Sequence, residues 1–301
     1  MTTEALLGSF ALFDTLEPIE QELVKGTWTA AENAYVPRSN FPVGSMILAA
    51  NAEGHTKIFR GCNVENRFFA PTICAERNAV TTAIAEGYTK LLKVALVCKK
   101  YQGPGASPCG LCRQVLTEFG CDADLFNLAD EHNNVRKAKI ADLLPAASGK
   151  GIAFDDLPFA MKRLVKRLHR LLPKSYVPYS KKPHAALFIA GNGDSGPMAY
   201  YGCATRIFEG VSDDNASYGG SASAECVAMR SARTAGFTRN VTLAVTVDDV
   251  HAHNPIDGEC LQVLREFGLE AKVLLVGPNR EVIEATIAEL LPDSFGPQSL
   301  A

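Results

Sequence analysis

Two long stretches of this chain follow the same plan, and this internal repeat restricts the possible folds more than any other feature. Tyr35-Val36-Pro37 returns as Tyr176-Val177-Pro178, and Gln114-Val115-Leu116 returns as Gln262-Val263-Leu264. The offset in residue number is 176 − 35 = 141 for the first pair and 262 − 114 = 148 for the second. Landmarks that match over two halves of domain size, with a small drift between them, indicate one domain that is present twice.

The boundary between the halves is predicted in the polar, glycine-containing stretch from Ala146 to Gly151, because linkers have this composition. We therefore expect one domain over residues 1–150 and another over residues 151–301. The chain has 301 residues, 47% of them hydrophobic, which is enough for two cores. Its formal charge is −3, whereas proteins that bind nucleic-acid phosphates usually carry a basic excess. Nucleic acid is therefore not expected as a partner, and small-molecule chemistry is.

The cysteines indicate a reducing compartment. There are nine, an odd number, and the apolar run from Ala5 to Phe13 lacks the basic start of a secretory signal. No apolar run approaches the length of a membrane span. We expect a cytoplasmic protein without membrane contact, in which paired cysteines serve a metal or catalysis rather than disulfides.

Three cysteines and one carboxylate gather in the first half, in Cys74-Ala75-Glu76 and Pro108-Cys109-Gly110-Leu111-Cys112. Helices are predicted over 74–85 and 109–119, so both motifs fall at helix starts, where positive partial charge stabilises thiolates. Either motif alone is weak, since Cys-x-Glu is commonly a core Cys beside a surface Glu and Cys-x-x-Cys can be structural or redox-active. Together they predict a zinc site with an open fourth position, and Glu76 as its proton shuttle.

The second half lacks most of this cluster. Ser223, Asp257 and Cys260 occupy its three cysteine positions, and Glu225 takes the place of Glu76. One thiolate beside a Ser and an Asp is a poor zinc site. We predict one zinc ion per chain and a catalytically silent second half.

The offset of the Tyr-Val-Pro motif extends this comparison into the strands of the two halves. It pairs Gly61 with Gly202, and it pairs Glu65 with Arg206. On this alignment the second half also lacks the polar strand positions of the first.

These motifs resemble the cytidine deaminase family, in which a His or Cys, a Glu and a Pro-Cys-x-x-Cys surround zinc. The resemblance implies a three-layer α/β/α domain with a mixed β-sheet between helices, present twice. It implies that Cys74, Cys109 and Cys112 hold Zn²⁺ and that activated water attacks C4 of the base while Glu76 moves the proton. The implied reaction converts cytidine and 2′-deoxycytidine to uridine and 2′-deoxyuridine with release of ammonia, as in pyrimidine salvage.

The resemblance also assigns substrate residues. It implies that Asn63 and Glu65 hold the ribose, that Phe41 stacks on the pyrimidine, and that Ala75 contacts the substrate. Arg77 would draw off the excess negative charge of three thiolates. The alternatives are an exposed strand end for Asn63 and Glu65, core packing for Phe41, and an exposed helix position for Arg77.

Phe295 follows Leu290-Leu291-Pro292 closely, whereas no aromatic follows Leu143-Leu144-Pro145. Short family members carry a Phe here that reaches a neighbouring subunit's pocket. We expect Phe295, from the same chain or its dimer mate, to lie beside Phe41; the alternative is an anchor for the C-terminal tail. Long two-domain members usually form dimers with His as first ligand, and short members with three Cys form tetramers. This chain combines long architecture with three Cys, and a homodimer is expected.

Two other functions stay open on the sequence alone. A related deaminase could act on another aminopyrimidine, such as a nucleoside antibiotic or a base in nucleic acid. A non-catalytic binding module stabilised by zinc is an alternative from a different class. Retention of Glu76 beside an open coordination position favours an enzyme, because a structural zinc site needs no proton shuttle.

Overall fold

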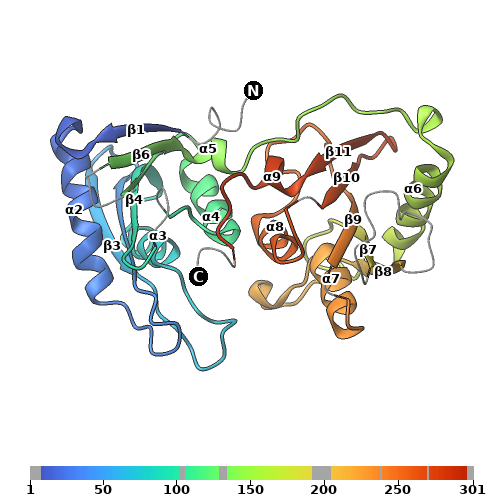
Figure 1. Ribbon diagram of the computed structural model, residues 1–301, viewed down its shortest axis with the longest axis horizontal. Helices are drawn as coiled ribbons and strands as arrows, with labels where there is room; N and C mark the ends of the chain where they lie inside the picture. Colours follow the sequence, from blue (N-terminus) through green and yellow to red (C-terminus); the bar gives the residue numbers. More distant parts are fainter. Residues whose placement is uncertain are drawn as a thin grey trace. The chain divides into compact units, whose positions relative to one another are not determined.

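The computed structural model describes residues 8–101, 106–128, 134–191, 205–237, 239–269 and 271–296. The chain forms two compact units. The first contains the residues up to Leu144 together with those from Pro292 onward, and the second runs from Pro145 to Leu291 (Figure 1). The C-terminal segment therefore belongs to the unit in which the chain begins. The roles predicted for the two domains, one catalytic and one silent, stay predictions.

The first unit contains a mixed six-stranded sheet in the order β1-β6-β5-β4-β2-β3. Only β4 and β5 are parallel neighbours, and the other pairs are antiparallel. The sequence predicts strands over residues 43–51, 57–63, 92–98 and 125–129, with a hairpin turn over residues 52–55. All four strands are present, and Gly54, with φ +85°, lies in that turn. The strands are β1 (Ser9–Leu12), β2 (Val43–Ala50), β3 (Thr56–Cys62), β4 (Lys90–Cys98), β5 (Asp124–Leu128) and β6 (Asn134–Lys139).

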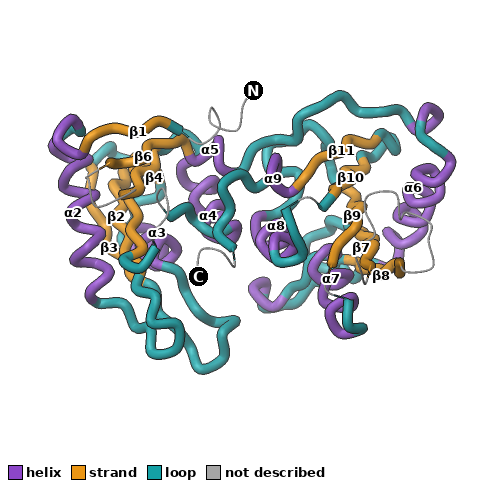
Figure 2. Tube along the Cα trace, in the orientation of Figure 1, coloured by secondary structure: helices purple, strands orange, loops and turns teal. Residues whose placement is uncertain are grey.

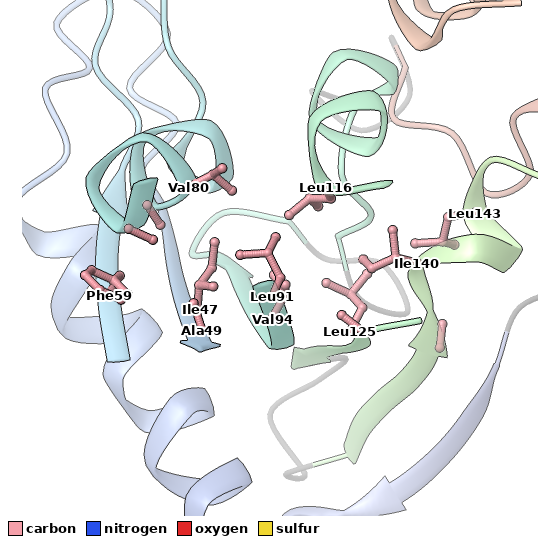
Figure 3. Close-up of a cluster of buried hydrophobic side chains, with 14 residues drawn as sticks. Ile47, Ala49, Phe59, Val80, Leu91, Val94, Leu116, Leu125, Ile140 and Leu143 are labelled. Carbon is pink, nitrogen blue, oxygen red and sulfur yellow. The ribbon is translucent and has the colours of Figure 1, made fainter. Parts of the chain in front are cut away.

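Helices cover both faces of this sheet, which makes the three layers (Figure 2). On one face, Leu23 and Val24 pack with Phe126. On the other, Val80 and Leu116 pack over Ile47 and further strand residues (Figure 3). The helices are α2 (Pro18–Glu32), α3 (Ala75–Ala85), α4 (Gly110–Gly120) and the short α5 (Ile140–Leu143). The predicted starts of α3 and α4 are confirmed to within one residue.

The second unit repeats this arrangement, with no strand that corresponds to β1 among its described residues. Its sheet has the order β11-β10-β9-β7-β8, and β9 and β10 are its parallel pair. The predicted fold, a duplicated α/β domain with a mixed sheet, is confirmed. Its strands are β7 (Ala185–Gly191), β8 (Thr205–Val211), β9 (Arg239–Thr246), β10 (Lys272–Val276) and β11 (Val282–Thr286); its helices are α6 (Phe159–Leu171), α7 (Ala224–Thr234), α8 (Gly258–Arg265) and α9 (Ile287–Leu290).

One landmark of the repeat was paired incorrectly. A Cβ on Gly61 would lie 2.2 Å from the Ala75 oxygen, and a Cβ on Gly210 would lie 2.0 Å from the Ala224 oxygen. Gly210 is therefore the counterpart of Gly61, at an offset of 210 − 61 = 149. Gly202, which the sequence suggested, lies outside the described residues. The physical reason is a longer connection between β7 and β8, which raises the offset from 141 to 149.

The same correction applies to the polar strand positions. Val64 bridges to Tyr35, and Asp213 bridges to Tyr176 in the same way. The counterpart of Glu65 is therefore Asp214, and the pairing of Glu65 with Arg206 was wrong.

None of the helices in the described parts of the chain is both long and apolar enough to cross a membrane.

Candidate active site

The three cysteines of the first unit lie together at the starts of two neighbouring helices. Cys74 precedes α3, Cys109 precedes α4, and Cys112 lies in the first turn of α4. Cys109 Sγ lies 3.8 Å from Cys74 Sγ and 3.5 Å from Cys112 Sγ, and all three sulfurs fall within 4.8 Å of one another. Tetrahedral zinc with Zn–S bonds near 2.3 Å requires sulfurs about 3.8 Å apart. The donor set therefore fits a zinc ion.

The pKa values of the three thiols depend strongly on one another. Hydrogen bonds with Cys112 and Cys74 hold the pKa of Cys109 well below its ordinary value. The hydrogen bond with Cys109 raises the pKa of Cys74 to about 11, and that of Cys112 is raised for the same reason. Three thiols this close cannot all ionise by themselves, because each thiolate repels the next. A bound metal ion would remove that restriction.

Glu76 follows these ligands into the first turn of α3 and is buried, with 4% of its surface exposed. Burial, together with the charge of Cys74, raises the pKa of Glu76 to about 7. Its counterpart Glu225 is buried in the same way, and its pKa is also raised to about 7, by burial and by Asp257. The raised pKa thus follows from the buried place that both glutamates take in the first turn of their helices. Among the described residues, only Glu76 has three thiols beside it.

Arg77 is held against the thiol cluster and is not an exposed helix residue. Its Nη2 donates to the Thr72 oxygen at 3.0 Å and lies 3.9 Å from Cys74 Sγ. Its Nε is buried and has no hydrogen-bond partner in the described part of the structure. The guanidinium therefore lies beside the Cys74 sulfur, where a positive charge would be attracted to a thiolate.

Asn63 and Glu65 both bind the loop that carries Phe41. Asn63 Nδ2 donates to the Phe41 oxygen, and Asn63 Oδ1 accepts from the backbone nitrogen of Val43, both at 2.9 Å. The Glu65 carboxylate accepts from the backbone nitrogen of Arg38 at 2.8 Å. Glu65 is buried, so the alternative of an exposed strand end does not apply to it.

Hydrogen bonds to the Glu65 carboxylate also determine the direction in which its pKa is shifted. Burial by itself would raise its pKa, but hydrogen bonds from Ser39 and Arg38 outweigh burial and lower it. In the second unit, Asp214 accepts from the backbone nitrogens of Tyr179 and Ser180 at 3.0 and 2.8 Å. Because both units keep a carboxylate in this position, it has a structural task in both: it shapes the loop that precedes β2 in the first unit and β7 in the second.

Phe295 lies beside Phe41 of the same chain, within the first unit. The two ring centroids are 6.1 Å apart and the planes are inclined by 64°, an edge-to-face arrangement. Both side chains are half-buried. The C-terminal segment thus brings its aromatic residue to the residue predicted to stack on a base.

Arg113, directly after Cys112, was missed by the sequence reasoning. It is fully buried and donates hydrogen bonds to the C-terminal segment. A comparison of the two halves could have identified it. Leu261 follows Cys260 as Arg113 follows Cys112, at an offset of 261 − 113 = 148. A charged residue where the repeat has a buried leucine needs a specific set of partners.

The second unit has ordinary helix caps where the first has thiols. Ser223 Oγ accepts from the backbone nitrogen of Cys226, and Asp257 accepts from that of Cys260. Neither Cys74 nor Cys109 makes such a bond. A side-chain cap contributes about 1 kcal/mol. In the first unit, α3 and α4 therefore lack the side-chain caps that α7 and α8 have, because Cys74 and Cys109 occupy the N-cap positions.

Glu225, Asp257 and Cys260 also lie within 4.8 Å of one another. Asp257 is already engaged as the cap of α8. The polar pocket beside them, of about 300 Å³, is lined by Lys182 among other residues. Lys182 stands at the position of Phe41, at an offset of 182 − 41 = 141. At the positions of Cys74, Cys109 and Phe41, the described residues of the second unit are therefore Ser223, Asp257 and Lys182, which offer neither a thiol nor an aromatic ring.

Comparison with known proteins agrees with this geometry. Residues 18–126 match the family model described as "Cytidine and deoxycytidylate deaminase zinc-binding region". The cytidine deaminase of Sporosarcina psychrophila is 37% identical over 144 residues, which are 48% of this chain and 98% of that protein. The cytidine deaminase of Mycobacterium tuberculosis is 38% identical over 141 residues, 46% of this chain and 95% of that protein.

Among solved structures, the cytidine deaminase of Burkholderia pseudomallei is similar at 38% identity, with 41% of this chain and 94% of that chain covered and a TM-score of 0.36. The sequence relatives carry the assignment, because almost their entire length is matched at 37% and 38% identity. On this ground the chain, whose first unit holds three thiols and a buried Glu, belongs to the cytidine deaminase family.

Proposed function

We propose that this protein deaminates cytidine and 2′-deoxycytidine by hydrolysis, giving uridine or 2′-deoxyuridine and ammonia. The observation that carries the proposal is the spacing of the Cys74, Cys109 and Cys112 sulfurs, which suits tetrahedral zinc, beside the buried carboxyl of Glu76. We further propose a homodimer that acts in cytoplasmic pyrimidine salvage.

Cys74, Cys109 and Cys112 would hold a Zn²⁺ ion, which would supply the Lewis acid that activates water for the attack. Glu76 takes a proton from the attacking water and gives it to N3 of the base. It then takes the second proton, from the new hydroxyl on C4, and gives it to the amine, which leaves as ammonia while C4 becomes a carbonyl. Burial of Glu76 excludes bulk water from this proton transfer. The helix starts and Arg77 offset the negative charge of the thiolates.

The substrate would lie between the metal and the loop around Phe41. Phe41 and Phe295 present ring surfaces to the pyrimidine, and Ala75 lies between Cys74 and Glu76 at the start of α3. Asn63 and Glu65 hold the loop and, with their remaining hydrogen-bonding capacity, the ribose hydroxyls.

The experiment compares substrates and one matched pair of variants. Cytidine, deoxycytidine, cytosine and CMP are tested for loss of cytosine absorbance, and zinc is measured per chain. The two nucleosides should react and the other two should not. Glu76→Gln should keep zinc and lose turnover by at least about 100-fold, because general acid–base catalysis contributes that much.

Glu225→Gln is the control, since Glu225 has the same burial and the same place in the repeat. It should leave turnover unchanged. Full activity of Glu76→Gln would refute the proton-shuttle role. Zinc binding without turnover of any of the four substrates would favour a non-catalytic module, and turnover of a different aminopyrimidine would change the substrate.

A further inference from the structure

Arg113 is among the largest fully buried side chains of the chain. It belongs to α4 and directly follows Cys112, whereas Leu261 fills the corresponding place in α8. Its guanidinium is charged at neutral pH, because arginine is effectively always protonated in proteins. A buried charge of this kind is destabilising unless its N–H groups are paired.

The guanidinium of Arg113 holds the C-terminal segment from one side. Nη1 donates to the Pro292 oxygen at 2.6 Å, and Nη2 donates to the Asp293 oxygen at 2.8 Å. Nη1 also donates to the Leu143 oxygen at 2.5 Å, at the end of α5. Backbone oxygens from two segments that lie far apart in the sequence therefore meet on one side chain.

The same guanidinium also holds the loop that leads to the thiols. Nε donates to the Pro108 oxygen at 2.8 Å, and Nη2 donates to Ser107 Oγ at 3.0 Å. Pro108 immediately precedes Cys109. Arg113 thus links the C-terminal segment directly to the thiol cluster.

A second buried arginine holds the segment by its side chain. Arg136, 3% exposed, forms an ion pair with the Asp293 carboxylate. Asp293 has φ +49°, a left-handed backbone conformation that is uncommon for residues other than glycine. The chain therefore turns sharply at Asp293, whose backbone oxygen is bound by Arg113 and whose carboxylate is bound by Arg136. Two residues later, Phe295 packs against Phe41.

We propose that Arg113 is a positioning residue for the substrate pocket: it fixes Pro292 and Asp293 so that Phe295 stands over Phe41. The inference rests on the proposed function. It gives a reason for the arginine in α4 at the place where α8 has Leu261: the guanidinium binds the backbone oxygens of Pro292 and Asp293.

The test is a double-mutant cycle on the Michaelis constant. Phe295→Ala should raise KM for cytidine about tenfold, in line with the loss of one aromatic contact to a base. Arg113→Ala should raise KM by a similar factor, with smaller effects on kcat. If Arg113 acts through Phe295, the double variant should stay within about twofold of Phe295→Ala, whereas independent sites would multiply to about a hundredfold.

Leu261→Ala is the matched control, since it opens a buried site at the same place in α8. It should lower the melting temperature and leave KM unchanged. Asp293→Asn serves as a second variant if Arg113→Ala fails to fold: it weakens the ion pair with Arg136, and Asn tolerates the left-handed backbone. It should raise KM in the same direction. Multiplicative effects in the cycle, or an unchanged KM in both Arg113→Ala and Asp293→Asn, would overturn the proposal.

A readout independent of turnover separates this proposal from the proposed function. Hydrogen exchange of the backbone amides at Asp293–Gly296 should become faster in Arg113→Lys, because an ammonium cannot make the five bonds of the guanidinium. Unchanged exchange would overturn the positioning role of Arg113 whatever the substrate is. Faster exchange in a protein that does not deaminate cytidine would refute only the function.

Discussion

Gly61 in β3 controls how closely α3 approaches the sheet. It lies opposite Ser45 of β2, and a Cβ added to it would meet the Ala75 oxygen at 2.2 Å and the Ala79 nitrogen at 2.5 Å. Both atoms are helix backbone, which cannot turn aside as a side chain can. Ala75 stands between Cys74 and Glu76, so any displacement of α3 moves a metal ligand and the proposed proton shuttle together.

The size of the effect of Gly61→Ala follows from these distances. Ordinary van der Waals contact begins near 3.4 Å, so α3 would have to move by about 1.2 Å (3.4 − 2.2). Overpacking of this kind costs about 1–3 kcal/mol of stability. A misplacement of about 1 Å in a catalytic group can lower turnover about 100-fold. We therefore expect a moderate loss of stability and a large loss of activity.

Gly210→Ala is a matched control in the second unit. Its Cβ would meet the Ala224 oxygen at 2.0 Å and the Ala228 nitrogen at 2.7 Å, so the steric conflict is the same. Thermal melting, zinc content and cytidine turnover should be measured for both variants. Both should melt at a lower temperature, and only Gly61→Ala should lose zinc affinity and turnover.

Two results would refute this reasoning. Unchanged kcat and zinc content in Gly61→Ala would show that α3 adapts without moving the site. An equal loss of activity in Gly210→Ala would show that the second unit takes part in catalysis, against the prediction that it is silent.

Three further predictions concern metal and pH. Cys109→Ala should lose zinc as well as activity and should melt earlier, because metal binding contributes free energy to folding; metal analysis and calorimetry test this. Metal analysis of the unmodified protein should find one zinc ion per chain, and two would mean that the cluster at Cys260 binds metal. Glu20 is buried with Lys93 Nζ 2.5 Å from its carboxylate. Burial opposes its ionisation, but pairing with Lys93 outweighs burial and lowers its pKa. A lowered folded-state pKa contributes stability that is complete above the unfolded value, near 4.3, and is lost as the pH falls through the folded value. Tm should therefore fall less steeply below about pH 4 in Glu20→Gln than in the unmodified protein.

The sequence alone was sufficient for the fold, the family and the composition of the thiol cluster. Zinc chemistry requires particular residue types at particular spacings, and Cys74, Cys109 and Cys112 follow that rule next to helix starts. The internal repeat could also be recognised from the sequence, because two copies of one domain bury the same faces of their helices and strands and so keep similar residues at those positions. For this reason the strands β2 to β5 and the helices α3 and α4 were predicted within a few residues.

The register of the repeat was decided by tertiary structure. The offset between the two copies is constant only while connections have equal length, and the longer β7–β8 connection changes it from 141 to 149. Only the close approach of Gly210 to α7, matching that of Gly61 to α3, identifies the counterparts. The pairing of Glu65 with Asp214 follows from this and could not be read from a fixed offset.

The partners of polar groups were also decided by tertiary structure. Nothing in the sequence around Arg113 shows that Pro292 and Asp293, far away along the chain, will meet its guanidinium. Likewise, the sequence suggested Phe295 as a partner of Phe41 but left open which chain would supply it; here the two rings meet within one chain. Helix and strand formation depend on neighbours along the chain, whereas a buried charge depends on whichever oxygens the completed fold brings within hydrogen-bonding distance.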